Sequence, residues 1–183
     1  MKPDEPAYSF RVKVGHVAVN PVQVTMTADT AERARIADVW HVGEVLSFTA
    51  NAAISRWKRD GVRLKGRVEA RIVQACVVTL EPVEQLISED FEALFVPDTS
   101  KLARIPLDET GELFLDPAGP DLPETFSGDS IDVGAVAVEF AALAIDPYPR
   151  KEGATFAGHV EDDGVAGKIS PFAVLKGKLG DDS

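Results

Sequence analysis

Two long stretches of alternating apolar and polar residues, about 45–58 and 62–77, constrain the fold more than any other feature of the sequence. Alternation with a period of two is typical of strands that bury one face of a sheet. Only Arg59-Asp60-Gly61 separates the two stretches, and so short a connection predicts an antiparallel hairpin. The chain is therefore expected to build an antiparallel sheet around this hairpin.

The apolar positions of the two stretches decide how the hairpin is paired. They are mostly even-numbered in both, from Leu46 to Ile54 and from Val62 to Cys76. A two-residue turn would place the two apolar sets on opposite faces, because a shift of one residue reverses every side chain. A three-residue loop, which pairs residue 58 with residue 62, places them on one face. Burial therefore favours the three-residue loop, with Gly61 in the left-handed conformation that such loops need.

The opposite face of this hairpin is the candidate functional surface. Residues 56–71 contain seven basic residues and two acidic ones, whereas the whole chain has a net charge of −11. The predicted pairing aligns these cations in a row, with a tryptophan near the hairpin tip. Such a surface can bind phosphates and stack on a base. The candidate RNA-binding residues are Trp57, Arg63, Lys65, Arg67, Arg71, Arg56 and Lys58.

A second interpretation of the same face is electrostatic neutralisation. A third alternating stretch, at 83–96, is expected to form the next strand, with Glu84, Asp90 and Glu92 on the face of the cations. Opposite charges pair across neighbouring strands. These acids would then neutralise Arg67 and Arg71, and the sequence leaves both interpretations open.

Two helices are predicted outside the three strands. Asp29-Thr30-Ala31-Glu32 has the pattern of a helix cap and predicts a short helix at about 30–39. Residues of about 131–145 are apolar on most sides of a helix, with acids only every seven residues, which predicts a long buried helix. We therefore expect an α+β fold, in which a curled and mainly antiparallel β-sheet or a partly closed barrel packs on the 131–145 helix.

The length and composition fit a single domain covering residues 1–183. We expect the segments 97–130 and 147–169, which are polar or rich in proline and glycine, to be mobile surface loops, and 176–183 to be a flexible tail. No run of about 18 uncharged apolar residues is present, and the first residues lack the pattern of a signal peptide. With one cysteine and hence no disulfide framework, we expect a cytoplasmic protein that has no membrane partner.

The sequence contains none of the common catalytic or metal-binding motifs. It has no nucleophile elbow, phosphate-binding glycine-rich loop or dinucleotide fingerprint. His16, His41 and His159 are scattered without metal-ligand spacing. Cys76 shares the apolar face of its strand, which indicates a small core residue and not a nucleophile. We therefore expect no enzyme activity, no catalytic residue, no metal, no cofactor and no small-molecule substrate.

Three separated stretches match the motifs of one family in order and spacing. Cys76–Val83 corresponds to a strand that ends in Cys-x-Arg-Cys-Leu and is followed by an acidic strand. Asp129–Pro149 corresponds to an Ile-Asp-Leu-Gly-like helix start with a Leu-Ala-Leu-x-Pro-like end, and Ser170–Leu175 to a terminal Asn-Pro-Phe-Ala-Val-Leu. The chain thus resembles the YceD family of large-ribosomal-RNA accumulation proteins over about residues 10–180.

The resemblance implies a non-catalytic ribosome biogenesis factor that promotes the accumulation of large-subunit (23S) ribosomal RNA. Its implied partner is large-subunit ribosomal RNA or a pre-ribosomal particle. The acidic stretch 81–132 would either dock a basic ribosomal protein or serve only as a solubilising surface loop, and the sequence leaves both interpretations open. Val78 and Thr79 replace the arginine and the second cysteine of the first motif, and a cysteine pair near 150–160 is absent. A zinc or redox role is therefore not carried over from the family.

Two other classes of function fit the same sequence. A small-molecule-binding β-barrel of the lipocalin type would need a roomy apolar interior, and a protein-interaction adaptor for a large-subunit ribosomal protein would bind protein alone. A short apolar segment at 171–175 lies in a polar tail, where it either docks on the sheet of its own chain or binds a partner. Its candidate docking residues are Phe172, Val174 and Leu175.

Overall fold

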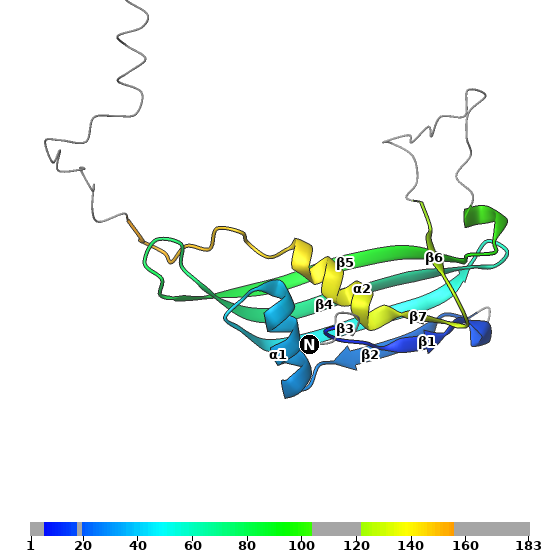
Figure 1. The fold of residues 1–183 in the computed structure, drawn as a ribbon, viewed down its shortest axis with the longest axis horizontal. Helices are drawn as coiled ribbons and strands as arrows, with labels where there is room; N and C mark the ends of the chain where they lie inside the picture. The colour runs from blue at the N-terminus through cyan, green and yellow to red at the C-terminus, as the bar shows by residue number, and fades with distance from the viewer. Residues whose placement is uncertain (1–5, 18–19, 104–121, 156–183) are drawn as a thin grey trace, which may run out of the picture. The chain divides into compact units, whose positions relative to one another are not determined.

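The computed structural model describes residues 6–17, 20–103 and 122–155. By its internal contacts the chain divides into two units, Met1–Glu152 and Gly153–Ser183. Only residues 153–155 of the second unit are described, so the single domain predicted from the sequence stays a prediction. The first unit contains all the described helices and strands (Figure 1). In chain order they are β1 (Arg11–Lys13), the 3-10 helix η1 (Val14–His16), β2 (Val22–Thr27), α1 (Thr30–Trp40), β3 (Glu44–Trp57), β4 (Gly61–Ala75), β5 (Pro82–Pro97), the 3-10 helix η2 (Lys101–Ala103), β6 (Glu124–Phe126), β7 (Ser130–Asp132) and α2 (Val133–Leu143).

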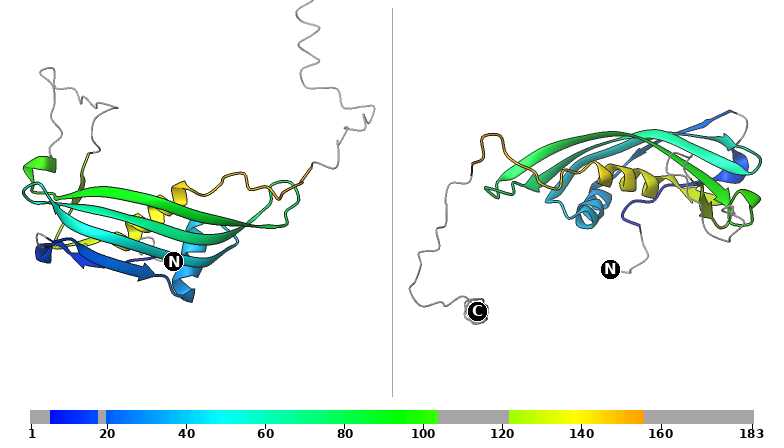
Figure 2. Two further views of the ribbon diagram at one scale, coloured as in Figure 1. Left: turned by 180° about the vertical axis from the view of Figure 1, so that it is seen from behind. Right: turned by 90° about the horizontal axis from the view of Figure 1, so that it is seen from above.

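Five strands form one curved sheet in the order β2-β3-β4-β5-β6, and β1 pairs with β7 separately. Neighbouring strands are antiparallel except β5 and β6, which run parallel. Both helices lie on the concave face of the sheet, while no described element covers the convex face (Figure 2). The predicted α+β class with a mainly antiparallel sheet is confirmed. The sheet formed by the described residues is open and is not a closed barrel, because its edge strands β2 and β6 do not pair with each other.

The β3–β4 hairpin places its apolar residues on the concave face, as predicted, but in a different register. Trp57 pairs with Gly61, so the loop consists of residues 58–60 and every predicted pair is displaced by two positions. A shift by two preserves both faces. The left-handed residue of the loop is Lys58, with a φ of 54°, and not Gly61 as expected. Gly61 is needed for space instead, because a Cβ there would lie 2.7 Å from Cε3 of Trp57.

A β-bulge interrupts this pairing near the start of β3. The register shifts between Val45 and Ser47, which leaves Leu46 without a partner on β4. One extra residue reverses the alternation of side chains. Val45, which is 3 % exposed, therefore replaces Leu46 as the inward residue. Leu46 is only partly buried, so its predicted place on the core face is wrong.

Helix α1 follows from its cap. The Asp29 carboxylate accepts the N–H of Glu32 at 2.8 Å, and the Glu32 carboxylate accepts the N–H of Asp29 at 2.7 Å. This reciprocal pair satisfies two backbone donors that the first turn leaves free. The helix buries Ile36 and Trp40 on the side of β3. The predicted helix at about 30–39 is confirmed.

Helix α2 is shorter than predicted and is buried on one face only. It begins after Asp132, whose carboxylate accepts the N–H groups of Ala135 and Phe10 at 3.1 and 2.9 Å. The residues just before it pair with β1 as strand β7, so the helix cannot begin where the sequence pattern places it. Leu143 in its last turn is 80 % exposed. The long buried helix expected at 131–145 is therefore not confirmed.

The mobility expected of the segments 97–130, 147–169 and 176–183 stays a prediction. The segment 97–130 contains η2, β6 and the first residue of β7, and its residues 104–121 lie outside the described ranges. Residues 147–155 contain no helix or strand, while 156–169 and the tail at 176–183 also lie outside those ranges. Strands of three residues produce no periodic signal, so the sequence does not predict β6 or β7. Neither helix of the described part is long and apolar enough to cross a membrane.

Gly66→Ala should destabilise the protein by about 1–3 kcal/mol, because overpacking a close-packed interior forces neighbouring groups apart. Gly66 pairs with Phe91 on the concave side, and a Cβ there would lie 2.7 Å from Cζ of that ring. Gly15→Ala is the matched control, since a Cβ at Gly15 meets no atom within 4 Å. Urea unfolding midpoints measure both variants. Equal midpoints would contradict the packing of Phe91 over Gly66.

Candidate nucleic-acid interface

The convex face of β4 carries the predicted row of cations. Most even-numbered residues of β4 are buried on the side of the helices, so the odd-numbered ones point to the convex face. Arg63, Lys65, Arg67 and Arg71 are exposed there, and no described element lies over them (Figure 2). The structure therefore brings four of the seven candidate residues into one row.

Two carboxylates of β5 pair with three of these cations. Glu92 forms ion pairs with Arg63 Nε at 3.1 Å and with Lys65 Nζ at 3.7 Å. Asp90 binds the guanidinium of Arg67 through two hydrogen bonds of 2.7 and 2.8 Å. Hydrogen bonding from Arg67 lowers the pKa of Asp90, so this pair stays ionised at neutral pH. The expected neutralisation is therefore found for Arg67, through Asp90, whereas Glu92 pairs with Arg63 and Lys65 instead.

Arg71 is the exception in the row. It lies opposite Leu86 on β5 and Ser47 on β3. None of the ion pairs formed within the described ranges involves Arg71. Glu84 lies two residues before Leu86 on β5, opposite Val73. The expected neutralisation of Arg71 is therefore wrong, because the register places a leucine opposite it where a carboxylate would be required.

Cations and acids balance on the convex face of β4 and β5. The four cations of the row share this face with Glu69, Glu84, Asp90 and Glu92. Because the ion pairs are exposed to solvent, they are weak and exchange readily with other partners. A polyanion that binds this face must therefore take cations over from Asp90 and Glu92.

The tip of the hairpin holds the remaining candidates in different orientations. Trp57 is partly buried on the convex face, and Lys58 Nζ lies 4.2 Å from the centroid of its ring, a cation–π contact. A base that stacks on that face of the ring must displace Lys58. Arg56 points away from the row, because its Nε donates to the Val17 carbonyl at 3.0 Å. Arg56 therefore does not belong to the row of cations.

Two further cations near the tip are not among the RNA-binding residues that we predicted from the sequence. Arg59 belongs to the hairpin loop, and Lys101 begins η2 just beyond β5. Both line one hollow together with Lys58. The basic composition of 56–71 is a signal for Arg59. No sequence pattern indicates Lys101, because only the length of β5 beyond the tip brings it there.

Cys76 lies in the turn after β4 and is fully buried. It is more than a small core residue, because its Sγ accepts the N–H groups of Lys151 at 3.4 Å and of Thr79 at 3.5 Å. Burial raises the pKa of a thiol, whereas hydrogen bonds to the thiolate lower it. Hydrogen bonding from the side chain of Thr79, together with the N–H groups of Lys151 and Thr79, prevails and lowers the pKa of Cys76 to about 6.

Further contacts join the same two segments. The Val77 N–H donates to the Pro149 carbonyl at 2.9 Å, and Lys151 Nζ pairs with Glu81 at 3.0 Å. Together with the hydrogen bonds to Cys76, they fasten residues 149–151 to the turn between β4 and β5, an arrangement that we call the Cys76 clasp. Within the described ranges, no three His, Cys, Asp or Glu side chains are placed to hold a metal ion.

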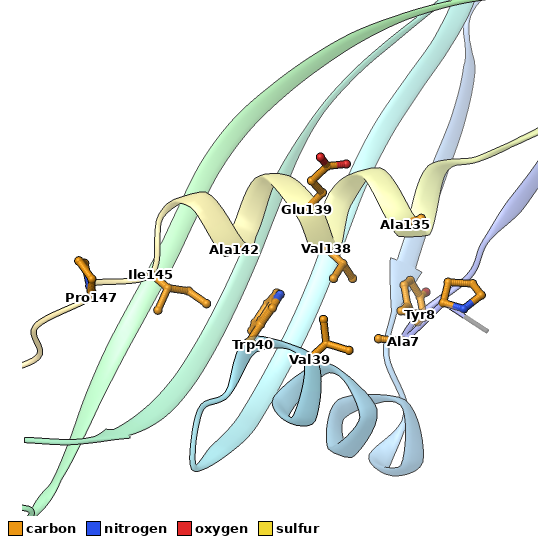
Figure 3. A pocket seen from close by; sticks show the side chains of 11 residues that line it. Ala7, Tyr8, Val39, Trp40, Ala135, Val138, Glu139, Ala142, Ile145 and Pro147 are labelled. Atoms are coloured by element: carbon orange, nitrogen blue, oxygen red, sulfur yellow. The ribbon is translucent and has the colours of Figure 1, made fainter. Parts of the chain in front are cut away.

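An apolar groove of about 600 Å³ separates α1 from α2 (Figure 3). Trp40 Nε1 is buried at its edge with no hydrogen-bond partner among the described residues. The groove lies between helices and is open, so it is not the enclosed sheet interior that a lipocalin-type barrel requires. Its lining consists of Pro6, Ala7, Tyr8, Val39, Trp40, Ala135, Val138, Glu139, Ala142, Ile145 and Pro147.

Comparison with known proteins identifies the family. The family model for the large ribosomal RNA subunit accumulation protein YceD matches residues 64–177, more than half of the chain. The chain belongs to the YceD family. No curated protein and no solved structure matches the chain.

The YceD match contains all three resembling motifs, but it begins within β4. The hairpin tip and Arg63 precede it, so the family resemblance is shown from residue 64 onward and not from about residue 10. Thr79 stands where the YceD motif has its second cysteine, and in the structure that position is a direct neighbour of Cys76. The docking residues expected in the third motif, Phe172, Val174 and Leu175, lie outside the described residues.

Cys76→Ser should remove a pH-dependent part of the stability of this YceD-family protein. A thiol whose pKa falls to about 6 on folding stabilises the folded state above its unfolded pKa of about 8.5. That contribution is lost as the pH falls to about 6, and serine does not ionise in this range. The difference in urea midpoint between wild type and variant should therefore grow from pH 6 to pH 9. A constant difference would contradict the lowered pKa.

Proposed function

We propose that this protein is a non-catalytic ribosome biogenesis factor, which promotes the accumulation of large-subunit (23S) ribosomal RNA by binding that RNA through the β3–β4 hairpin. Membership of the YceD family supports the role in the accumulation of large-subunit ribosomal RNA. The choice of the β3–β4 hairpin as the RNA-binding surface is supported by a row of cations on an exposed face, namely Arg63, Lys65, Arg67 and Arg71. This alignment is the observation that carries the proposal, because binding to an RNA backbone needs several cations within reach of one strand.

Binding proceeds by exchange of ion partners. RNA phosphates replace Glu92 and Asp90 as partners of Arg63, Lys65 and Arg67. Each exchange replaces one exposed pair by another, so the net gain comes mainly from counterions that the RNA releases. The affinity is therefore modest, and it falls steeply as the salt concentration rises.

Trp57 adds an apolar contact to this electrostatic surface. Stacking of a base on an aromatic side chain contributes about 1–3 kcal/mol in single-strand-binding proteins, and here the base displaces Lys58 from the ring. RNA accumulation follows from binding by mass action, since a ligand that binds one form of a macromolecule raises the population of that form. No bond-making or bond-breaking step is needed.

Arg63→Ser, Lys65→Ser and Arg67→Ser together should weaken binding to large-subunit RNA fragments by about tenfold or more. Loss of three phosphate contacts should also lower the slope of log K against log salt by about 2–3. Filter binding over a salt series measures both quantities. The three side chains are exposed, so circular dichroism should show an intact fold. Unchanged binding by the folded variant would exclude this surface.

The double variant Asp90→Asn/Glu92→Gln is the matched control, for which the opposite change in RNA affinity is expected. These changes free the same three cations while the side chains keep their size, so the RNA affinity should rise. A loss of fold would lower the affinity of both variants, whereas the exchange mechanism moves them in opposite directions. A lower affinity for Asp90→Asn/Glu92→Gln would contradict the exchange.

We propose a second function, that of an adaptor for a basic large-subunit ribosomal protein, on a separate observation. β5 pairs with β6 only at residues 95–97, so most of its outer edge has no strand beside it within the described ranges. Glu84 and Glu89 are exposed on this strand. A basic extended segment suits such an edge, because it can add a strand and place cations beside the acids. Docking of a partner on Phe172, Val174 and Leu175 belongs to this second proposal.

Pull-down before and after ribonuclease treatment distinguishes the two functions. An adaptor should retain a large-subunit ribosomal protein after the RNA has been digested, and Phe172→Ala, Val174→Ala and Leu175→Ala together should reduce that recovery. An RNA-binding factor should instead lose ribosomal proteins together with the RNA. Recovery of neither large-subunit RNA nor large-subunit proteins would argue against both functions.

A further inference from the structure

The hairpin tip, unlike the convex face, carries an excess of positive charge. A hollow of about 500 Å³ lies beside the loop that joins β3 to β4, and we call it the tip hollow. Three cations and one carboxylate line it, together with two hydroxyl side chains. These polar residues are Lys58, Arg59, Lys101, Asp60, Thr99 and Ser100.

Two segments of the chain build the tip hollow. Val62 pairs with Phe95, so β5 continues past the tip of the hairpin and its following residues lie beside the loop. Hydrogen bonds fix the backbone of this continuation. The Ser100 N–H donates to the Pro97 carbonyl at 2.8 Å, and Ser100 Oγ accepts the Leu102 N–H at 3.1 Å. Lys101, between two anchored residues, is therefore held on the hollow opposite the loop.

The groups on the tip hollow are those that proteins use to bind phosphate. Lysine offers a compact ammonium charge, arginine offers paired N–H donors, and a threonine hydroxyl can donate a hydrogen bond. Asp60 opposes an anion, but the three cations leave two positive charges in excess on the lining. A phosphodiester of an RNA backbone carries one negative charge, so the hollow can neutralise one such group completely.

Lys58 links the tip hollow to Trp57. Its ammonium lies over the tryptophan ring, at 4.2 Å from the centroid, and its side chain also lines the hollow. A cation–π contact at an exposed site is weaker than a charge-assisted hydrogen bond to phosphate. A phosphate in the hollow therefore draws the ammonium away from the ring and leaves that face of the ring open to a base.

We propose that the tip hollow binds a backbone phosphate of single-stranded RNA through Lys58, Arg59 and Lys101, and that the adjoining base then stacks on Trp57. The inference rests on the proposed RNA-binding function and identifies the point at which the RNA strand is held. The row of cations on the convex face then contacts the phosphates that follow.

The test compares two variants that each lose three positive charges. Lys58→Ser/Arg59→Ser/Lys101→Ser removes the cations of the tip hollow, and Arg63→Ser/Lys65→Ser/Arg67→Ser removes those of the face. Labelled oligouridylate is the probe, and binding is measured over a salt series. The tip variant should bind about tenfold more weakly, and its salt slope should fall by about 2. RNA-dependent quenching of tryptophan fluorescence, absent from Trp57→Phe, should also disappear in the tip variant.

The two variants separate the inference from the function on which it rests. If the face variant loses affinity while the tip variant binds like wild type, the tip hollow is not an RNA site and the proposed function stands. If neither variant loses affinity, both proposals are overturned. Asp60→Asn adds a measurement that misfolding cannot imitate, because removal of the one carboxylate should raise the affinity for oligouridylate. A lower affinity for Asp60→Asn would overturn the inference.

Free phosphate carries the same chemical group as an RNA backbone and is the alternative ligand of the tip hollow, so inorganic phosphate is the second probe. It is compared with chloride at equal ionic strength, as a competitor for oligouridylate and as a ligand alone by phosphorus NMR. Weak competition that is equal in wild type and tip variant supports an RNA site. Phosphate binding that depends on Lys58, Arg59 and Lys101, with equal RNA affinity in both proteins, would assign the hollow to free phosphate and overturn the proposal.

Discussion

Burial of one face of the β3–β4 hairpin determines which charged residues of these two strands lie on the convex surface. Successive residues of a strand point to opposite faces. Because Phe48, Ile54 and Leu64 are buried on the concave side, the residues next to them in the chain point to the convex side, which faces solvent. Burial of a large apolar side chain is worth about 1.5–3 kcal/mol, whereas an exposed ion pair contributes little. The core therefore places the cations, and the ion pairs adjust to the register that the core imposes.

The same alternation places the acids of β5, and in the RNA-binding function that we propose this gives the surface its selectivity. An isolated anion gains little from a face on which Asp90 already binds Arg67 and Glu92 already binds Arg63. A polymer that offers many phosphates at once replaces several carboxylates in one binding event and releases its own counterions. For the RNA binding that we propose, a balanced face discriminates in favour of long polyanions, and an acidic protein can carry such a surface without a large local excess of charge.

Sequence patterns predict the parts of this structure that depend on neighbours in the chain. Alternation indicates the hairpin and its two faces, and the Asp29–Glu32 pair indicates α1. The left-handed backbone of Lys58 leaves no trace in the alternation, so the register from Phe48 to Trp57 is displaced although the faces are kept. The extra residue at Leu46 is equally invisible in the alternation, and it turns that side chain off the core face. The row of cations is therefore predictable. The tip hollow is not, because Lys101 reaches it only through the length of β5.

The pairing of β1 with β7 has a consequence for how the chain is made. The Phe10 N–H reaches the Asp132 carboxylate across 122 positions of sequence, whereas β2 to β5 are joined mainly to the next strand along the chain. At a synthesis rate of about 5–20 residues per second, β1 is synthesised roughly 6–24 seconds before its partner. Locally connected strands form faster than distant ones. The meander can therefore form early during translation, while the N-terminal strand stays unpaired until α2 and its cap have been synthesised.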